Sequence, residues 1–252
     1  MKYTNKLASS ILAISFAISS ALADSTKDKD FICCFTEQKK AISSTSFITD
    51  KDGNKYKTTK IGKQHWMAED YKYEHSSSKC AIEGDNPDNC VRVYDIDRKS
   101  ESEVKKICPT GWRLPTKDDF NELGEYLMPQ NFNEMSVKQK RHARAKMSAQ
   151  LRSIHWDNGE DTFGFNAKPH KEIKKQLQAL GLQPKAECAC YVGIERIKEE
   201  VKDVDMSKPG HPLIYEKVAI SLKFCIDSEA LSIPSGLQFP ISNELRIRCI
   251  KE

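Results

Sequence analysis

The residues best suited to chemistry are nine cysteines, all of which follow residue 23. Cysteines form bridges, bind soft metals or act as nucleophiles, and the cellular compartment decides which use prevails. The first 23 residues have the parts of a secretory signal: Lys2 and Lys6, an apolar run over 7–18, and a small-residue cleavage site at 21–23. Export into an oxidising environment predicts that most of the cysteines form disulfides.

Two disulfides are predicted from the surroundings of the cysteines. Cys80 and Cys90 flank the polar segment 83–89, so a bridge between them would close a small surface loop. Cys108 precedes a Gly-Trp-x-Leu-Pro turn, and a bridge to Cys249 would fasten the last strand to the first helix. In the chain-entropy model, closing so long a loop stabilises the fold by about 4–5 kcal/mol, against about 3 kcal/mol for a short loop.

The other five cysteines allow two more bridges at most. Cys33 and Cys34 are adjacent, and a bond between neighbours would strain the peptide that joins them. Cys188 and Cys190 stand two residues apart, so their side chains share one face of a strand, which favours separate partners. We therefore expect the segment with Cys33 and Cys34 to be tied to the strand with Cys188 and Cys190, and Cys225 to be left over.

Oxygen ligands for a hard cation such as calcium gather in the segment 83–89. They are Asp85, Asn86, Asp88 and Asn89. The same composition around a proline is typical of a polar turn, which is the favoured interpretation. The segment Asp50-Lys51-Asp52-Gly53-Asn54 resembles the start of a calcium loop but lacks the distal glutamate, and its Asp-Gly pair is typical of a hairpin turn. The six histidines include no pair at helical zinc spacing. We expect neither a metal nor a cofactor.

One tryptophan is a candidate platform for stacking on a sugar ring. Trp156 is followed by Asp157, Asn158 and a glycine, which predicts a loop and an exposed position for the ring. Because loops carry function on a fixed scaffold, we place the binding surface at Trp156, Asp157, Asn158 and Tyr191.

These candidates must be positioned by a mixed set of strands and helices. The strongest helix signal follows Thr116, where Asp119 completes a capping box and apolar residues repeat at helical spacing. Further helices are predicted over 135–154, with Ile154 on the apolar stripe, and over 170–180. Strands are predicted at residues 47–49, 56–61, 64–67, 189–194, 214–224 and 245–250.

The net charge of the chain and its distribution limit the kinds of partner that we expect. The formal net charge is +4, and removal of Lys2 and Lys6 with the signal leaves about +2, which predicts no affinity for nucleic acid. The stretch 135–156 has basic residues and no acid, and it could meet an anionic surface. Its charges spread around the predicted helix without interleaved aromatics, so a solvated face is favoured. After signal removal no segment is expected to span a membrane.

Several segments occur in an order that is similar to one known family. They are Asp-Gly-Asn-Lys-Tyr at 52–56, Trp-Met-Ala-Glu at 66–69, Cys80, Cys90, Cys-Pro-x-Gly-Trp-x-Leu-Pro at 108–115, Gly-Phe-x-Ala at 164–167, and Arg248-Cys249. The chain resembles the Fibrobacter succinogenes-type major paralogous domain over residues 46–252, after a signal peptide at 1–23 and an extension at 24–45. The resemblance implies an exported bacterial protein with an α+β, C-type lectin-like fold: a twisted antiparallel sheet, flanking helices, and termini joined by a disulfide.

The resemblance also bears on the ligand. Trp66 and Trp112 belong to the shared motifs, so we expect them in the core. The middle segment of the family usually carries Trp-Trp-Ser-Ser, whereas residues 187–193 of this chain lack paired aromatics that could stack on sugars. The ligand could therefore be a carbohydrate or a protein. The location could be the periplasm, the cell surface or the medium.

An enzyme is the main alternative. The turn at 112–116 also resembles its counterpart in formylglycine-generating enzymes, which hold copper with a late cysteine pair. Cys188, Cys190 and Cys225 do not match the spacing of that pair, and no Ser-His-Asp order or glycine-rich phosphate loop is present. We predict a non-catalytic binding or cell-surface interaction module. A formylglycine-generating-type enzyme and a purely structural envelope protein are the alternatives.

Overall fold

The computed structural model describes residues 46–82, 90–171, 178–179, 187–201, 215–227, 231–232 and 245–252. The predicted signal at 1–23, the extension with Cys33 and Cys34, the calcium-type loop at 83–89 and most of the helix predicted over 170–180 lie outside the described residues. In the described part of the chain, no helix combines the length and apolar character needed to cross a membrane.

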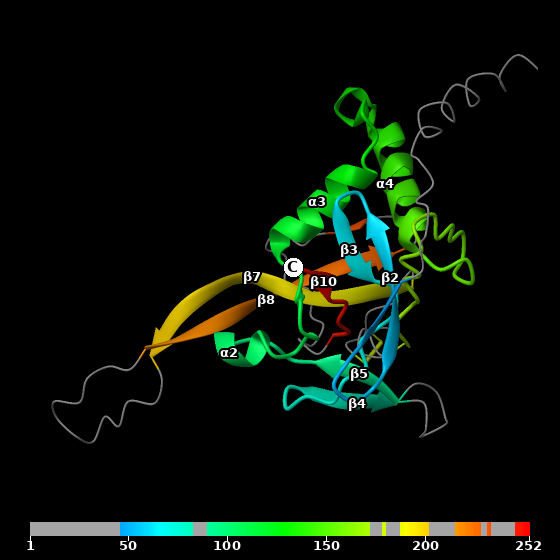
Figure 1. The fold of residues 1–252 in the computed structure, drawn as a ribbon. Coiled ribbons are helices and arrows are strands. Elements are labelled where there is room, and N and C mark those ends of the chain that lie inside the picture. Colours follow the sequence, from blue (N-terminus) through cyan, green and yellow to red (C-terminus); the bar gives the residue numbers. More distant parts are fainter. Residues whose placement is uncertain are drawn as a thin grey trace, which may run out of the picture. The chain divides into compact units, whose positions relative to one another are not determined.

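A five-stranded antiparallel sheet joins the first and last described segments of the chain (Figure 1). Its strand order is β1-β2-β3-β10-β6. The strands are β1 (Ser46–Thr49), β2 (Lys55–Ile61), β3 (Gln64–Met67), β10 (Ile250–Lys251) and β6 (Trp112–Arg113). Ile250 pairs with Trp66 on one side and with Arg113 on the other, so β10 bridges two parts of the sheet. The predicted strand at 245–250 is thus shorter than expected.

The hairpin of β1 and β2 is organised by Asp50. Its Oδ1 accepts hydrogen bonds from the backbone N–H groups of Asp52 and Asn54, each at 2.9 Å, and its Oδ2 accepts one from the Tyr56 hydroxyl at 2.6 Å. Gly53 has a φ of 86°, in the left-handed region that favours glycine. The predicted hairpin with its Asp-Gly turn is confirmed.

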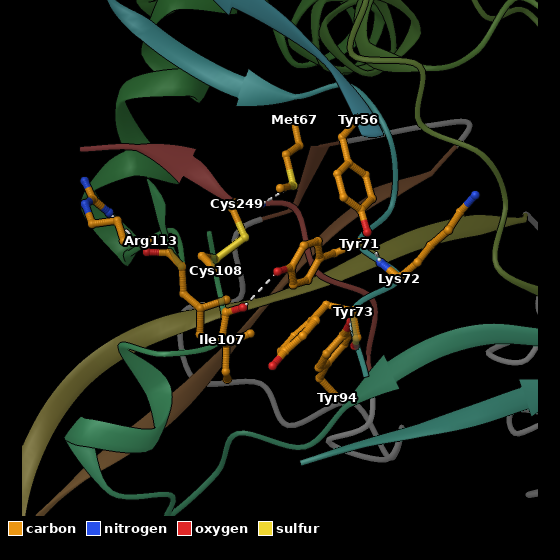
Figure 2. Close-up of a disulfide and its surroundings, with 11 residues drawn as sticks. Tyr56, Met67, Tyr71, Lys72, Tyr73, Tyr94, Ile107, Cys108, Arg113 and Cys249 are labelled. Carbon is orange, nitrogen blue, oxygen red and sulfur yellow. Dashed lines mark hydrogen bonds between the residues drawn. A yellow bond between two sulfur atoms is a disulfide. The ribbon is translucent and has the colours of Figure 1, made fainter. Parts of the chain in front are cut away.

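Both disulfides predicted from the sequence are present. Cys108 and Cys249 are joined across 141 positions of sequence, beside β6 and β10 (Figure 2). Cys80 and Cys90 are joined within a separate two-stranded sheet of β4 (Ser78–Ile82) and β5 (Cys90–Tyr94).

The third sheet corrects the expected pairing of the remaining cysteines. It contains β7 (Cys188–Val201), β8 (Tyr215–Asp227) and β9 (Leu231–Ser232), in that order. Cys190 lies directly opposite Cys225 in the β7–β8 register, and the two form a disulfide. The expectation that Cys225 is left over, with Cys190 tied to the extension, is therefore wrong. Directly opposed side chains are close enough to bridge, and the register decides which residues are opposed.

The structure contains two of the helices predicted from the sequence, and one of them is shorter than predicted. In α3 (Lys117–Leu127), Thr116 and Asp119 form the predicted capping box. The second helix, α4 (Val137–Leu151), ends before Ile154, whose side chain is 67 % exposed instead of lying on the apolar stripe. Two shorter helices are α2 (Glu101–Val104) and η2 (Phe132–Glu134).

The β7–β8 pair runs between α3 and α4 on one side and β4 and β5 on the other (Figure 1). Successive residues of β7 enter two different clusters of buried side chains: Cys190 enters the first, with Trp112, and Tyr191 enters the second, with Trp66. This alternation is the two-residue period of a strand that is buried on both faces. Trp66 and Trp112 are buried, as predicted.

Candidate functional site

A cleft of about 240 Å³ lies where four segments of the chain meet. Its lining comes from the segments 68–72, 90–92, 166–168 and 246–248. Two of these segments adjoin the five-stranded sheet, one belongs to β5, and one belongs to the loop that follows α4. The cleft is therefore a product of long-range packing.

The segment that follows β3 is fixed on several sides. The backbone N–H of Tyr71 donates to the carbonyl of Ile247 at 3.0 Å, and its hydroxyl donates to the carbonyl of Ile107 at 3.0 Å (Figure 2). The backbone N–H of Lys72 donates to the Tyr56 hydroxyl at 3.1 Å. Asp70, next to Tyr71, is thereby held beside the segment that leads into β10.

Asp70 is paired with two arginines. Arg246 Nη1 donates to Asp70 Oδ2 at 2.7 Å, and Arg248 donates to Oδ1 from Nε at 2.9 Å and from Nη2 at 2.8 Å. The side chains of Arg246 and Arg248 are only 5 % and 2 % exposed. Hydrogen bonds between ionised groups are short and directional, so they fix all three side chains at the cleft.

Arg248 also holds the loop after α4. Its Nη1 donates to the carbonyl of Phe165, and its Nη2 donates to the carbonyl of Asn166 at 3.1 Å. The guanidinium carbon lies 4.5 Å from the centroid of the Phe165 ring and 5.0 Å from that of Tyr191. A planar group with several donors can serve a carboxylate, two carbonyls and aromatic rings at once, which a lysine cannot.

His170 links this cluster to β7. Its Nδ1 accepts a hydrogen bond from the backbone N–H of Cys190 at 3.0 Å, which assigns the proton of a neutral ring to Nε2. Nε2 lies 4.0 Å from Asp70 Oδ2. The imidazole meets the Tyr191 ring edge-on, with the centroids 5.1 Å apart.

Protonation in this cluster is set by burial and by charge. Burial raises the pKa of Asp70, but the electrostatic interactions with Arg248, His170 and Arg246 outweigh burial and hold that pKa well below its usual range. Burial lowers the pKa of Arg248, but Tyr191 and Asp70 reverse the effect, and the pKa is raised. Burial raises the pKa of Tyr191 above its usual range. At neutral pH the cluster therefore holds a carboxylate, two guanidinium ions and a neutral phenol.

Residues 59–183 match the sequence profile of the Fibrobacter succinogenes major domain. The chain belongs to this family. The matched range contains Asp70 and the loop after α4, whereas Arg246, Arg248 and Cys249 lie beyond it. No curated protein and no solved structure shows significant similarity to the chain.

The binding residues predicted for this member of the Fibrobacter succinogenes major domain family need correction. Trp156 is 5 % exposed and lies in the second core cluster, so the expectation of an exposed ring is wrong. Tyr191, 1 % exposed, is buried there too. Asp157 and Asn158 are exposed, but their backbone carbonyls accept hydrogen bonds from buried Arg152. The Arg152 guanidinium lies 5.5 Å from the centroid of Trp156, and these contacts fold the loop inward over the ring.

Four residues of the charge cluster were not predicted: Asp70, His170, Arg246 and Arg248. Two of them are connected with the segments that resemble the family, because Asp70 directly follows the segment 66–69 and Arg248 belongs to the segment Arg248-Cys249. The sequence feature that could have indicated this cluster is the spacing of Arg246 and Arg248. Two cations on one face of an extended, apolar segment require a carboxylate partner when that segment is buried.

Metal chemistry has limited support in the described residues. Cys190 and Cys225 are joined to each other, so neither thiol is available as a soft ligand. Within the described ranges, no three His, Cys, Asp or Glu side chains are grouped so that they could hold a metal ion. The oxygen ligands considered at 85–89 lie outside those ranges.

Proposed function

We propose that the protein is an exported, non-catalytic binding module with a C-type lectin-like fold, and that the cleft beside Asp70 holds its ligand. The observation that carries the proposal is the pairing of Asp70 with Arg246 and Arg248 within the charge cluster, because these three side chains fix one another and line the cleft. A concave site with a few convergent polar groups is the usual place for a ligand.

The protonation of the cluster favours binding over catalysis. General acid–base catalysis needs a group whose pKa lies near the working pH. The pKa of Asp70 is held low and that of Arg248 is raised, so both groups keep their charge at neutral pH. Arg248 also directs its donors to Asp70 and to two backbone carbonyls, which makes it a fixed part of the wall.

Two further features support the proposed fold and location. The Cys108–Cys249 disulfide and the insertion of β10 between β3 and β6 close the domain on itself, with α3 and α4 beside antiparallel strands. The three disulfides among the described residues favour an oxidising compartment, which in bacteria is the periplasm, the cell surface or the medium.

A ligand screen with an obstructed cleft tests the proposal. The purified protein is applied to an array of neutral saccharides, acidic saccharides and peptides, alongside Lys168→Trp, which places an indole at the cleft. Lys106→Trp is the matched control, because Lys106 is exposed and does not line the cleft. We expect a ligand that binds the protein and the control but not Lys168→Trp.

Other outcomes would contradict specific parts of the proposal. Binding that survives Lys168→Trp would place the ligand elsewhere. Failure to bind any member of the array would favour the structural envelope protein. Conversion of a cysteine-containing peptide to formylglycine would favour the enzyme.

A further inference from the structure

The cleft has an excess of positive charge. Among the described residues, five cationic side chains line it, against two carboxylates. The cations are Lys72, Arg92, Lys168, Arg246 and Arg248, and the carboxylates are Glu69 and Asp70. A concave surface that is dominated by one sign of charge concentrates ions of the opposite sign.

Both carboxylates of the cleft are engaged by the protein itself. Asp70 accepts hydrogen bonds from Arg246 and Arg248. Glu69 Oε2 accepts a hydrogen bond from the backbone N–H of Lys57 at 2.8 Å. These carboxylates neutralise part of the positive charge but leave the outer cations of the cleft unmatched.

The outer cations are accessible to a ligand. Lys72 and Lys168 are exposed, and their ammonium groups form no ion pair with the part of the chain that is described. The Arg92 side chain is 19 % exposed, and its Nη2 lies 3.0 Å from Oε2 of Glu74, whose side chain is 74 % exposed. Because the Glu74 carboxylate is open to water, its pair with Arg92 contributes little to stability, and a bound anion can replace Glu74 as the partner of Arg92.

Asn166 adds a fixed neutral group. Its backbone N–H donates to Asp161 Oδ1 at 2.6 Å, and its carbonyl accepts from Arg248. Its φ of 54° lies in the left-handed region, which asparagine tolerates better than most residues. The backbone is thus held on both sides, and the residue lines the cleft. Its amide can both donate and accept hydrogen bonds.

Size limits the part of a ligand that can enter. The cleft measures about 240 Å³, whereas pockets that enclose a whole drug-sized ligand measure about 300–1,000 Å³. The cleft therefore suits a single ring or side group, with the rest of the ligand outside.

We propose that the cleft binds one acidic sugar unit of a saccharide, with the sugar carboxylate at the cations Lys72, Arg92 and Lys168. This inference rests on the proposed binding function and specifies its ligand. Hydroxyl groups need both donors and acceptors, which Asn166 and the Glu69 carboxylate supply beside those cations. A carboxylate carries one charge, so Glu69 and Asp70 repel it less than they would a phosphate dianion.

The test uses D-glucuronate and D-glucose as probes, which differ in the carboxylate. Binding is followed by backbone amide chemical shifts of the full protein at low ionic strength. We expect glucuronate to shift resonances of residues that line the cleft, and to bind at least about tenfold more tightly than glucose. Raising the salt concentration to about 0.3 M should weaken glucuronate binding, because salt screens exposed charges.

A double substitution gives the matched comparison. Lys72→Gln with Lys168→Gln should weaken glucuronate binding by about tenfold. Lys106→Gln with Lys138→Gln removes the same charge away from the cleft and should leave binding within about twofold. The thermal unfolding of both double variants establishes that they are folded.

Four results would overturn the inference. They are equal binding of glucose and glucuronate, tighter binding of inorganic phosphate, tighter binding of N-acetyl-aspartate amide as a peptide probe, and no response to glucuronate. The first three leave a ligand in the cleft, so the proposed binding function survives them. If the fourth occurs while the array yields a cleft-dependent ligand, only the ligand class is wrong.

Discussion

Arg152 and Arg248 are buried to the same degree, each 2 % exposed, and both hold the loop that follows α4. Each donates to two backbone carbonyls of that loop, and each lies over an aromatic ring. Their charge environments differ. Arg248 has a hydrogen-bonded carboxylate in Asp70, whereas the described hydrogen bonds of Arg152 all go to backbone carbonyls.

The difference is visible in the pKa of each guanidinium. Burial lowers the pKa of Arg152, and the more distant carboxylates of Asp157, Asp227 and Glu160 only partly offset that effect. At Arg248 the neighbouring groups outweigh burial, and the pKa is raised. A buried arginine whose partners are backbone carbonyls thus serves to hold a loop. A buried arginine that is paired with a carboxylate and lines a cleft can also belong to a binding site.

The largest expected effect on stability follows from the loss of the Arg248 side chain. Arg248→Met leaves Asp70 with one of its two arginine partners and removes the donors to two carbonyls, so we expect a loss of about 3–5 kcal/mol in the free energy of unfolding. Urea denaturation at neutral pH measures it. Arg98→Met is the control: the side chain is 65 % exposed in its pair with Glu200, and its loss should cost within about 0.5 kcal/mol.

Part of the stability at this site should depend on pH. The folded pKa of Asp70 is lowered, so the ionised carboxylate stabilises the fold above the unfolded pKa of about 3.9, and that stabilisation is lost as the pH falls toward the folded pKa. Below about pH 4, the free energy of unfolding should therefore fall more steeply for the natural protein than for Asp70→Asn. Arg152→Met should keep the steep dependence. Parallel curves for the natural protein and Asp70→Asn would contradict the assigned ionisation.

Arg152 should matter less than Arg248. Arg152→Met removes the hydrogen-bond donors to the carbonyls of Asp157 and Asn158. Unlike Arg248→Met, it does not take a hydrogen-bonded arginine away from a carboxylate. We expect a loss of about 1–3 kcal/mol, measured in the same urea experiment. A cost equal to that of Arg248→Met would mean that the carboxylate does not distinguish the two arginines.

The smallest effect concerns the loop that Arg152 holds. Asn158 has a φ of 52°, which is unfavourable for residues with an ordinary β-carbon. Asn158→Ala should lower the stability by about 1 kcal/mol. Asn158→Gly, which suits this conformation, should stay within about 0.5 kcal/mol of the natural protein. Thermal unfolding compares them. If either change abolished ligand binding, the site would lie at this loop instead of the cleft beside Asp70.

The features determined by the sequence itself are mostly local. The capping box of Thr116 and Asp119, the hairpin turn at Gly53 and the Cys80–Cys90 loop each depend on residues that are near one another in the chain. The Cys108–Cys249 disulfide is the exception. It could be predicted because its cysteines stand beside a turn and a strand that the family resemblance brings together.

The cysteine partners in β7 and β8 and the residues of the cleft depend on the tertiary structure. Cys190 meets Cys225 because of the strand register, which a one-residue shift would change. Trp156 turns inward because Arg152 folds its loop over the ring. Asp70 and Arg248 are 178 positions apart, and nothing in the local pattern around either residue specifies the other. Their meeting follows from the insertion of β10 beside β3, because hydrogen bonding between those strands aligns the two segments from opposite ends of the domain.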